Sequence, residues 1–371
     1  MSNFDLNAIL RGAQLTLVGA YRALQNPKLF NNEHYQQAAL AVGAGLLISF
    51  LVWIPTFGIR VIVKLVALFS ASEQSTWDDD IMDGLEYIEH SVLQVPFLLM
   101  SLMRYITPTL DNMFMESLQW VDTTYYRKHQ SDDPTNLRAT YYENLKQYDT
   151  HGAASTQRKP KEGAKKGAMV FLKRYARRTG ISLAIYAASF LPVVGKFVLP
   201  AASFYTFKNA VGTQPAVGIF AVGIFVPRKV LVSFLQTYFA SRSLMRELLE
   251  PYFSRITFEK DQKRLWFKDR EGVLFGFGVG FYLIMKIPLF GVLVYGIAEA
   301  STAYLITKIT DPPPPPSDSE GFSTSQVRWT NKHEFLNLSM DQIDALNAEI
   351  GATKKKISQS EGFKLPGKKY S

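Results

Sequence analysis

A proline followed three residues later by a glycine occurs three times inside charge-poor apolar runs of this chain, as IPTFG, LPVVG and IPLFG. Proline removes an amide donor and moves the preceding residue away from helical geometry, while glycine permits a turn. Each pair either folds an apolar helix back into a hairpin or only kinks a continuous helix, and we favour hairpins. Helix breaks are therefore predicted at Pro55, Gly58, Pro192, Gly195, Pro288 and Gly291.

The apolar runs around these breaks predict an all-α, multipass integral membrane protein. Residues 35–59 carry no charge, and their length suffices to cross a hydrocarbon core of about 30 Å. We expect a helical membrane domain over 31–310, with a polar loop at 127–178. Its four apolar blocks are expected at about 35–70, 180–207, 209–240 and 272–309.

The two ends of the chain differ from this membrane domain. Residues 1–30 are predicted to form an amphipathic helix, which either lies in the headgroup layer or packs on the rest of the protein. Its apolar face comprises Leu6, Ile9, Leu10, Leu17, Tyr21 and Leu24. Residues 311–371 begin with five prolines and are expected to form a stiff linker and a mostly disordered cytosolic tail, with one short helix at about 339–351.

The net charge of +9 is concentrated in one stretch, which has nine basic residues and one acid. This stretch is either a cytosolic loop that sets membrane topology or a site for anionic lipid headgroups. Aromatic residues are scarce among the basic ones, so nucleic acid is not an expected partner. The candidate headgroup residues are Arg158, Lys159, Lys161, Lys165, Lys166, Lys173, Arg174, Arg177 and Arg178.

Three glycines at helical spacing, Gly272, Gly276 and Gly280, predict a close helix–helix contact. Their partner is either a neighbouring helix of the same chain or a second copy, which would give a homo-oligomer. The glycines lack the spacing, the preceding strand and the lysine of a phosphate-binding loop.

Nothing in the chain predicts a catalytic, cofactor or metal site. Cysteine is absent, the five histidines are scattered, and the acids between 78 and 89 read as the capped start of a helix. Lys196, Lys286 and Glu299 lie in apolar runs, where charges suggest transport, but such short helices leave each charge near an interface. We therefore expect no enzyme and no cofactor.

Two phrases near the N-terminus, AILRGAQLTLVGAYRALQNPKLF and HYQQAALAVGAG, together with the three breaks, resemble the fungal transmembrane proteins of the UsgS family. The breaks are more distantly similar to etoposide-induced and CysZ-like membrane proteins, and to yeast sporulation proteins of lipid droplets. The resemblance implies an endomembrane protein of filamentous fungi that is linked to development. It brings no catalytic residues, and no position here carries over the sulfate movement of the CysZ-like proteins.

These observations lead to one expected function and one alternative. The expected function is a non-enzymatic membrane protein of the endoplasmic reticulum or lipid droplets, with cytosolic termini, that organises membrane or lipid. The alternative is a channel or transporter for a small solute or anion, which the broken helices favour.

Overall fold

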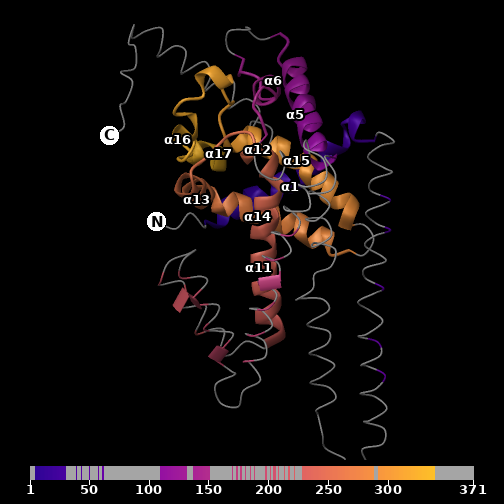
Figure 1. Ribbon diagram of the computed structural model, residues 1–371, viewed down its shortest axis with the longest axis vertical. Coiled ribbons are helices and arrows are strands. Elements are labelled where there is room, and N and C mark those ends of the chain that lie inside the picture. The colour runs from indigo at the N-terminus through magenta and orange to yellow at the C-terminus, as the bar shows by residue number, and fades with distance from the viewer. Residues whose placement is uncertain are drawn as a thin grey trace, which may run out of the picture.

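The structure of the chain is a computed structural model that describes residues 5–30, 109–131, 137–150, 228–287 and 291–338, with single helical residues between 39 and 221. All regular secondary structure in these ranges is helical, as predicted (Figure 1). The longer helices are α1 (Leu6–Leu24), α5 (Thr109–Lys128), α11 (Arg228–Leu248), α13 (Lys260–Asp269), α14 (Glu271–Met285) and α15 (Gly291–Ile309). The short ones are η1 (Pro27–Phe30), α6 (Tyr142–Leu145), α12 (Glu250–Phe253), η4 (Pro316–Asp318), α16 (Phe322–Ser325) and α17 (Lys332–Asn337).

The multipass architecture predicted from the apolar runs finds no support in these helices. Within the described ranges, none of them combines the length and the hydropathy that a bilayer crossing demands.

α14 and α15 form a helical hairpin around the third predicted break. α14 ends at Met285, and α15 begins at Gly291, the glycine of the IPLFG phrase. The Nε atom of Arg270, the residue before α14, donates a hydrogen bond of 2.8 Å to the carbonyl oxygen of Ile309, the last residue of α15. A continuous kinked helix would separate these two residues by roughly 58 Å. At this break the hairpin is therefore the observed form.

α1 packs against α14 through residues without bulky side chains. A Cβ atom on Gly276 would lie 1.9 Å from the carbonyl oxygen of Ile9, and one on Gly12 would lie 2.1 Å from a carbonyl oxygen of α14. At the next turn of α14, a Cβ atom on Gly280 would lie 2.5 Å from Oγ1 of Thr16. The two backbones approach this closely only because glycine occupies these positions.

The outward face of α1 is the leucine-rich face that the sequence singled out. Leu6 and Leu17 are 68% and 69% exposed, whereas Gly12, Thr16 and Gly19 are buried. The helix therefore packs on the rest of the protein through its small residues and Leu15, and leaves its other leucines exposed.

α15 is the central helix of the described body. It contacts α1, α5 and α14, and every residue from 298 to 310 is buried. α5 covers one side of it through buried side chains such as Phe114 and Leu118. This packing gives the hairpin a core made from helices distant in the sequence.

α11 contacts α14 only over its second half. Ser241 marks the crossing point, because a Cβ atom on Gly278 would lie 2.8 Å from its carbonyl oxygen. The first half of α11 projects away from the other long helices (Figure 1). Beyond α11, the ring of Phe253 stacks on that of Phe267, and Trp266 packs edge-to-face against both, which joins α12 to α13.

The predicted disorder of the tail does not hold for residues 311–338, which fold back onto the body. Asn144 and the hydroxyl group of Tyr148 donate hydrogen bonds of 2.7 Å to the carbonyl oxygens of two prolines, Pro313 and Pro314. Further along, the ring of Phe335 is buried. Composition suggested disorder because these contacts are made with residues far away in the chain. The short helix predicted at 339–351 lies outside the described residues.

Candidate functional site

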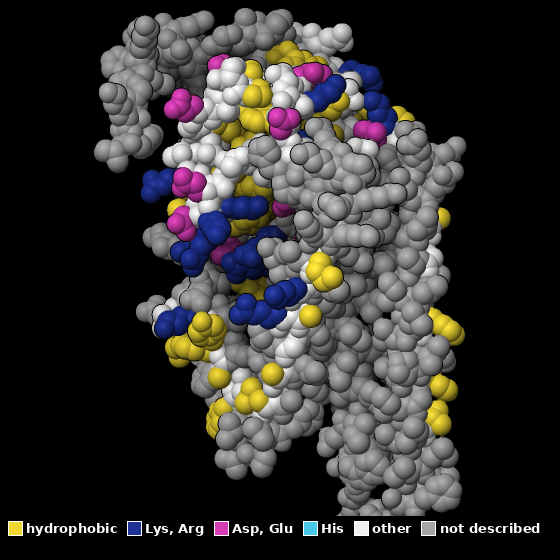
Figure 2. All heavy atoms as spheres, in the orientation of Figure 1, with side chains coloured by type: hydrophobic (Ala, Val, Ile, Leu, Met, Phe, Trp, Pro, Cys, Tyr) yellow, Lys and Arg dark blue, Asp and Glu magenta, His cyan; other side chains and the backbone are white. Residues whose placement is uncertain are grey.

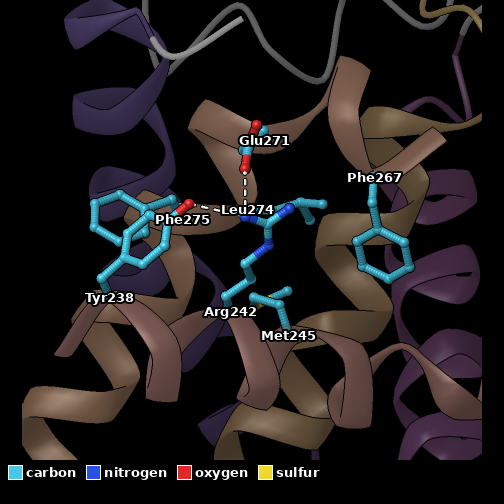
Figure 3. A pocket seen from close by; sticks show the side chains of 7 residues that line it. All are labelled: Tyr238, Arg242, Met245, Phe267, Glu271, Leu274 and Phe275. Atoms are coloured by element: carbon cyan, nitrogen blue, oxygen red, sulfur yellow. Dashed lines mark hydrogen bonds and ion pairs between the residues drawn. The ribbon is translucent and has the colours of Figure 1, made fainter. Parts of the chain in front are cut away.

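The described residues form a pocket where α11, α13 and α14 meet (Figure 3). Arginine and glutamate face each other in it, and aromatic and aliphatic side chains make up most of its walls. The empty space, including its open mouth, is about 340 Å³. The lining residues are Tyr238, Arg242, Met245, Phe267, Glu271, Leu274 and Phe275.

Arg242 extends from α11 across the pocket (Figure 3). One nitrogen of its guanidinium group, Nη1, lies 3.1 Å from Oε1 of Glu271 and donates a hydrogen bond of 2.8 Å to the hydroxyl group of Tyr238. The ring of Tyr238 lies 5.6 Å from that of Phe275, centroid to centroid. The side chain of Arg242 is 38% exposed and that of Glu271 is 9% exposed, so the arginine is the part of the pair that reaches solvent.

Several cations surround the single carboxylate of the pocket. Burial raises the pKa of Glu271, and the positive charges of Arg242, Lys268 and Arg246 oppose that shift. Arg246 and Lys268 are exposed, and the guanidinium carbon of Arg246 lies 5.8 Å from the ring centroid of Phe267. Three cations therefore act on the one carboxylate of the pocket lining.

The basic side chains lie at a boundary on the surface of the protein. Figure 2 shows lysine and arginine side chains in a band across the face that α11, α13 and α14 share, with acidic side chains level with the band or above it. Exposed large apolar side chains lie on α1 and η1, on α11 as far as Phe239, at the bend between α14 and α15, and at several of the single helical residues between 50 and 217. On α11 and at the bend they are Val230, Phe234, Phe239, Leu283, Ile284, Ile287 and Leu293. On α5, α6, α12, α13, α16 and α17, Leu265 is the one such residue.

The structure places a minority of the residues singled out from the sequence. Gly291 begins α15, and Pro55, Gly58, Pro192, Gly195 and Pro288 lie outside the described residues. Gly272 is buried in α14, and α1 of the same chain covers Gly276 and Gly280. A second copy of the chain could therefore not pack against these two glycines in this arrangement. Of the nine candidate headgroup residues, Lys173 and Arg177 are helical and exposed, and the others lie outside the described residues.

The three charges predicted in apolar runs differ in their surroundings. Lys286 is exposed just after α14, with its ammonium nitrogen 5.0 Å from the ring centroid of Tyr282. Glu299 is fully buried within α15, and Lys196 lies outside the described residues. The described charges therefore do not line one shared path.

Sequence reasoning missed the pocket itself. Arg242 and Glu271 belong to a segment, 241–271, whose one visible signal was its mixture of charges of both signs. Within the described ranges, no group of three or more acidic or histidine residues is placed to hold a metal ion. Comparisons of the chain with family models, curated proteins and solved structures found no match.

Proposed function

We propose that the chain is a non-enzymatic protein of the endoplasmic reticulum or of lipid droplets that sits in the membrane through helical hairpins and organises its lipid. The observation that carries this proposal is the division of α11 into two halves. Val230 and Phe234 are exposed in its first half, after Arg228 and Lys229. Its second half carries the partly exposed Arg242 and the exposed Arg246. Apolar surface beside a band of positive charge suits insertion below the headgroup layer.

The hairpin at the third break supports a one-sided arrangement. Because Arg270 and Ile309 lie together, the chain leaves the hairpin where it entered it. Such hairpins suit the surface of a lipid droplet, which has a single phospholipid layer and no aqueous compartment beneath it.

Imaging of the full chain tests this proposal. We expect a fluorescent fusion to label the endoplasmic reticulum and to coat lipid droplets after lipid feeding. The control is the same fusion with Val230 and Phe234 both changed to Gln, which should remain in the cytosol to a much greater extent. Labelling restricted to the plasma membrane would contradict the proposal.

A further inference from the structure

We propose that the tail of the chain docks on α1, with residues 339–351 forming a helix that covers the exposed apolar face of α1. This inference goes beyond the proposed function, because it assigns an occupant within the chain to a surface that the proposed membrane contact of α11 does not use. The face to be covered comprises four exposed side chains of α1: Leu10, Leu17, Tyr21 and Leu24.

The described part of the tail ends beside this face. Arg11 of α1 donates a hydrogen bond of 3.0 Å to the carbonyl oxygen of Leu336 and another to that of Leu338. Phe335 is buried, and its ring centroid lies 6.0 Å from the guanidinium carbon of Arg11. Leu10 is the neighbour of Arg11 in α1, so the segment after Leu338 begins next to the apolar face.

The segment that follows has the length and the pattern to cover the face. Residues 339–351 lie outside the described residues, and their sequence predicts a short amphipathic helix. Such a helix would rise by roughly 18 Å, while α1 rises by roughly 20 Å from Arg11 to Leu24. Ile343, Leu346 and Ile350 fall on one side of it, at spacings of three and four residues. Docking would therefore remove apolar surface of both helices from water.

The charges of the two helices are complementary. α1 contains two basic residues, Arg11 and Arg22, and no acidic residue. Residues 339–351 contain three acidic residues and no basic one; the acids are Asp341, Asp344 and Glu349. A second copy of α1 on the same face would instead bring two basic helices together. Electrostatic complementarity thus favours the tail of the chain as the occupant.

Cysteine labelling tests the docking in the full-length chain, which has no cysteine of its own. Ala13→Cys places a thiol on the exposed side of α1 and keeps every large apolar side chain of the face. Reaction with a maleimide is followed in detergent. We expect it to become at least about 10-fold faster when Ile343, Leu346 and Ile350 are all changed to Gln, because their burial stabilises the docked form. The control is Val230→Cys on α11, which is 58% exposed and should react equally fast in both backgrounds.

A cross-link identifies the occupant. In the double variant Ala13→Cys/Asn347→Cys, a short bismaleimide should join the two thiols within one chain. Val230→Cys/Asn347→Cys is the matched control and should not be joined. Cross-linking of Ala13→Cys/Asn347→Cys only between two chains would assign the face to a second copy and overturn the proposal.

The labelling rates give two further outcomes that would overturn it. If the Ala13→Cys thiol reacts as fast as the Val230→Cys thiol in the otherwise unchanged chain, nothing covers the face. If it reacts slowly and the three Gln substitutions leave that rate unchanged, detergent or lipid covers the face instead of the tail.

Discussion

Gly12 of α1 and Gly276 of α14 lie at the closest approach of two helices that are separated by more than half of the chain. A Cβ atom on either glycine would come within 2.1 Å of a backbone carbonyl oxygen of the opposite helix. Real Cβ atoms do not approach oxygen this closely, so any larger residue must push the helices apart. This crossing fixes the amphipathic N-terminal helix to the hairpin and thereby sets the direction of its exposed leucine face.

The variant Gly276→Ala should therefore destabilise the protein by about 1 to 3 kcal/mol, because overpacking forces backbone shifts. Thermal unfolding of the detergent-solubilised chain measures the change. The control is Gly43→Ala, in a helix where a Cβ atom would meet nothing within 4 Å. That substitution should be neutral or stabilise the protein, since alanine favours helix over glycine. Equal effects of the two changes would contradict the close crossing.

Arg270 holds the ends of the hairpin together, and its loss should free the tail. Arg270 is 1% exposed and donates a hydrogen bond to the carbonyl oxygen of Ile309. Its guanidinium carbon lies 4.5 Å from the ring centroid of Trp266 and 5.8 Å from that of Trp329. We expect Arg270→Gln to cost about 2 to 3 kcal/mol, as for a hydrogen bond to a charged group. Hydrogen exchange should then accelerate at residues 326–338. Unchanged exchange there would show that the tail is held by other contacts.

The polyproline segment should depend on the hydroxyl group of Tyr148. The variant Tyr148→Phe keeps the ring and removes the donor to Pro314, which should cost about 1 kcal/mol. Limited proteolysis between residues 311 and 321 measures the effect, and cleavage should become faster. Tyr21→Phe is the control, because Tyr21 is exposed on α1.

The exposed apolar half of α11 should contribute to membrane binding. Phe234→Gln removes a large side chain that is 45% exposed in the structure, and should weaken vesicle binding by about 1 to 2 kcal/mol. Leu265→Gln is the matched control, because Leu265 is 50% exposed on α13, outside the apolar surface. Vesicle binding is measured by flotation. If Leu265→Gln reduces flotation as much as Phe234→Gln does, there is no defined membrane-facing surface.

Periodicity and breaker residues predicted the local structure of this chain well. They placed α1 and the break at Gly291, because these signals act over a few residues. The orientation of α1 could not be deduced in the same way. Its apolar face left open whether the helix lies in the headgroup layer or packs on the protein. Gly12 and Thr16 pack on α14 beside Gly276 and Gly280, which are far away in the chain. The pocket was equally out of reach, because Arg242 and Glu271 meet only after α11 and α14 cross.

The tail shows the same limit of sequence reasoning. Five prolines and a polar composition indicate disorder when only neighbouring residues are considered. Residues 311–338 are ordered through partners elsewhere in the chain, such as Asn144 and Tyr148 for the prolines and Arg11 for the carbonyl oxygens of Leu336 and Leu338. Pairings between segments so far apart leave no periodic signal.

Glycosylation mapping tests the one-sided membrane arrangement. Acceptor sites are inserted at two exposed turns, after Gln130 and after Glu320, in the full chain translated with endoplasmic reticulum membranes. Hydrogen bonds from Asn144 and Tyr148 to Pro313 and Pro314 hold the two segments in one body, so both turns must face the same side. If that side is the cytosol, neither site is glycosylated, while a signal-peptide fusion carrying the same acceptor is modified as the positive control. Modification at either turn would contradict the one-sided arrangement.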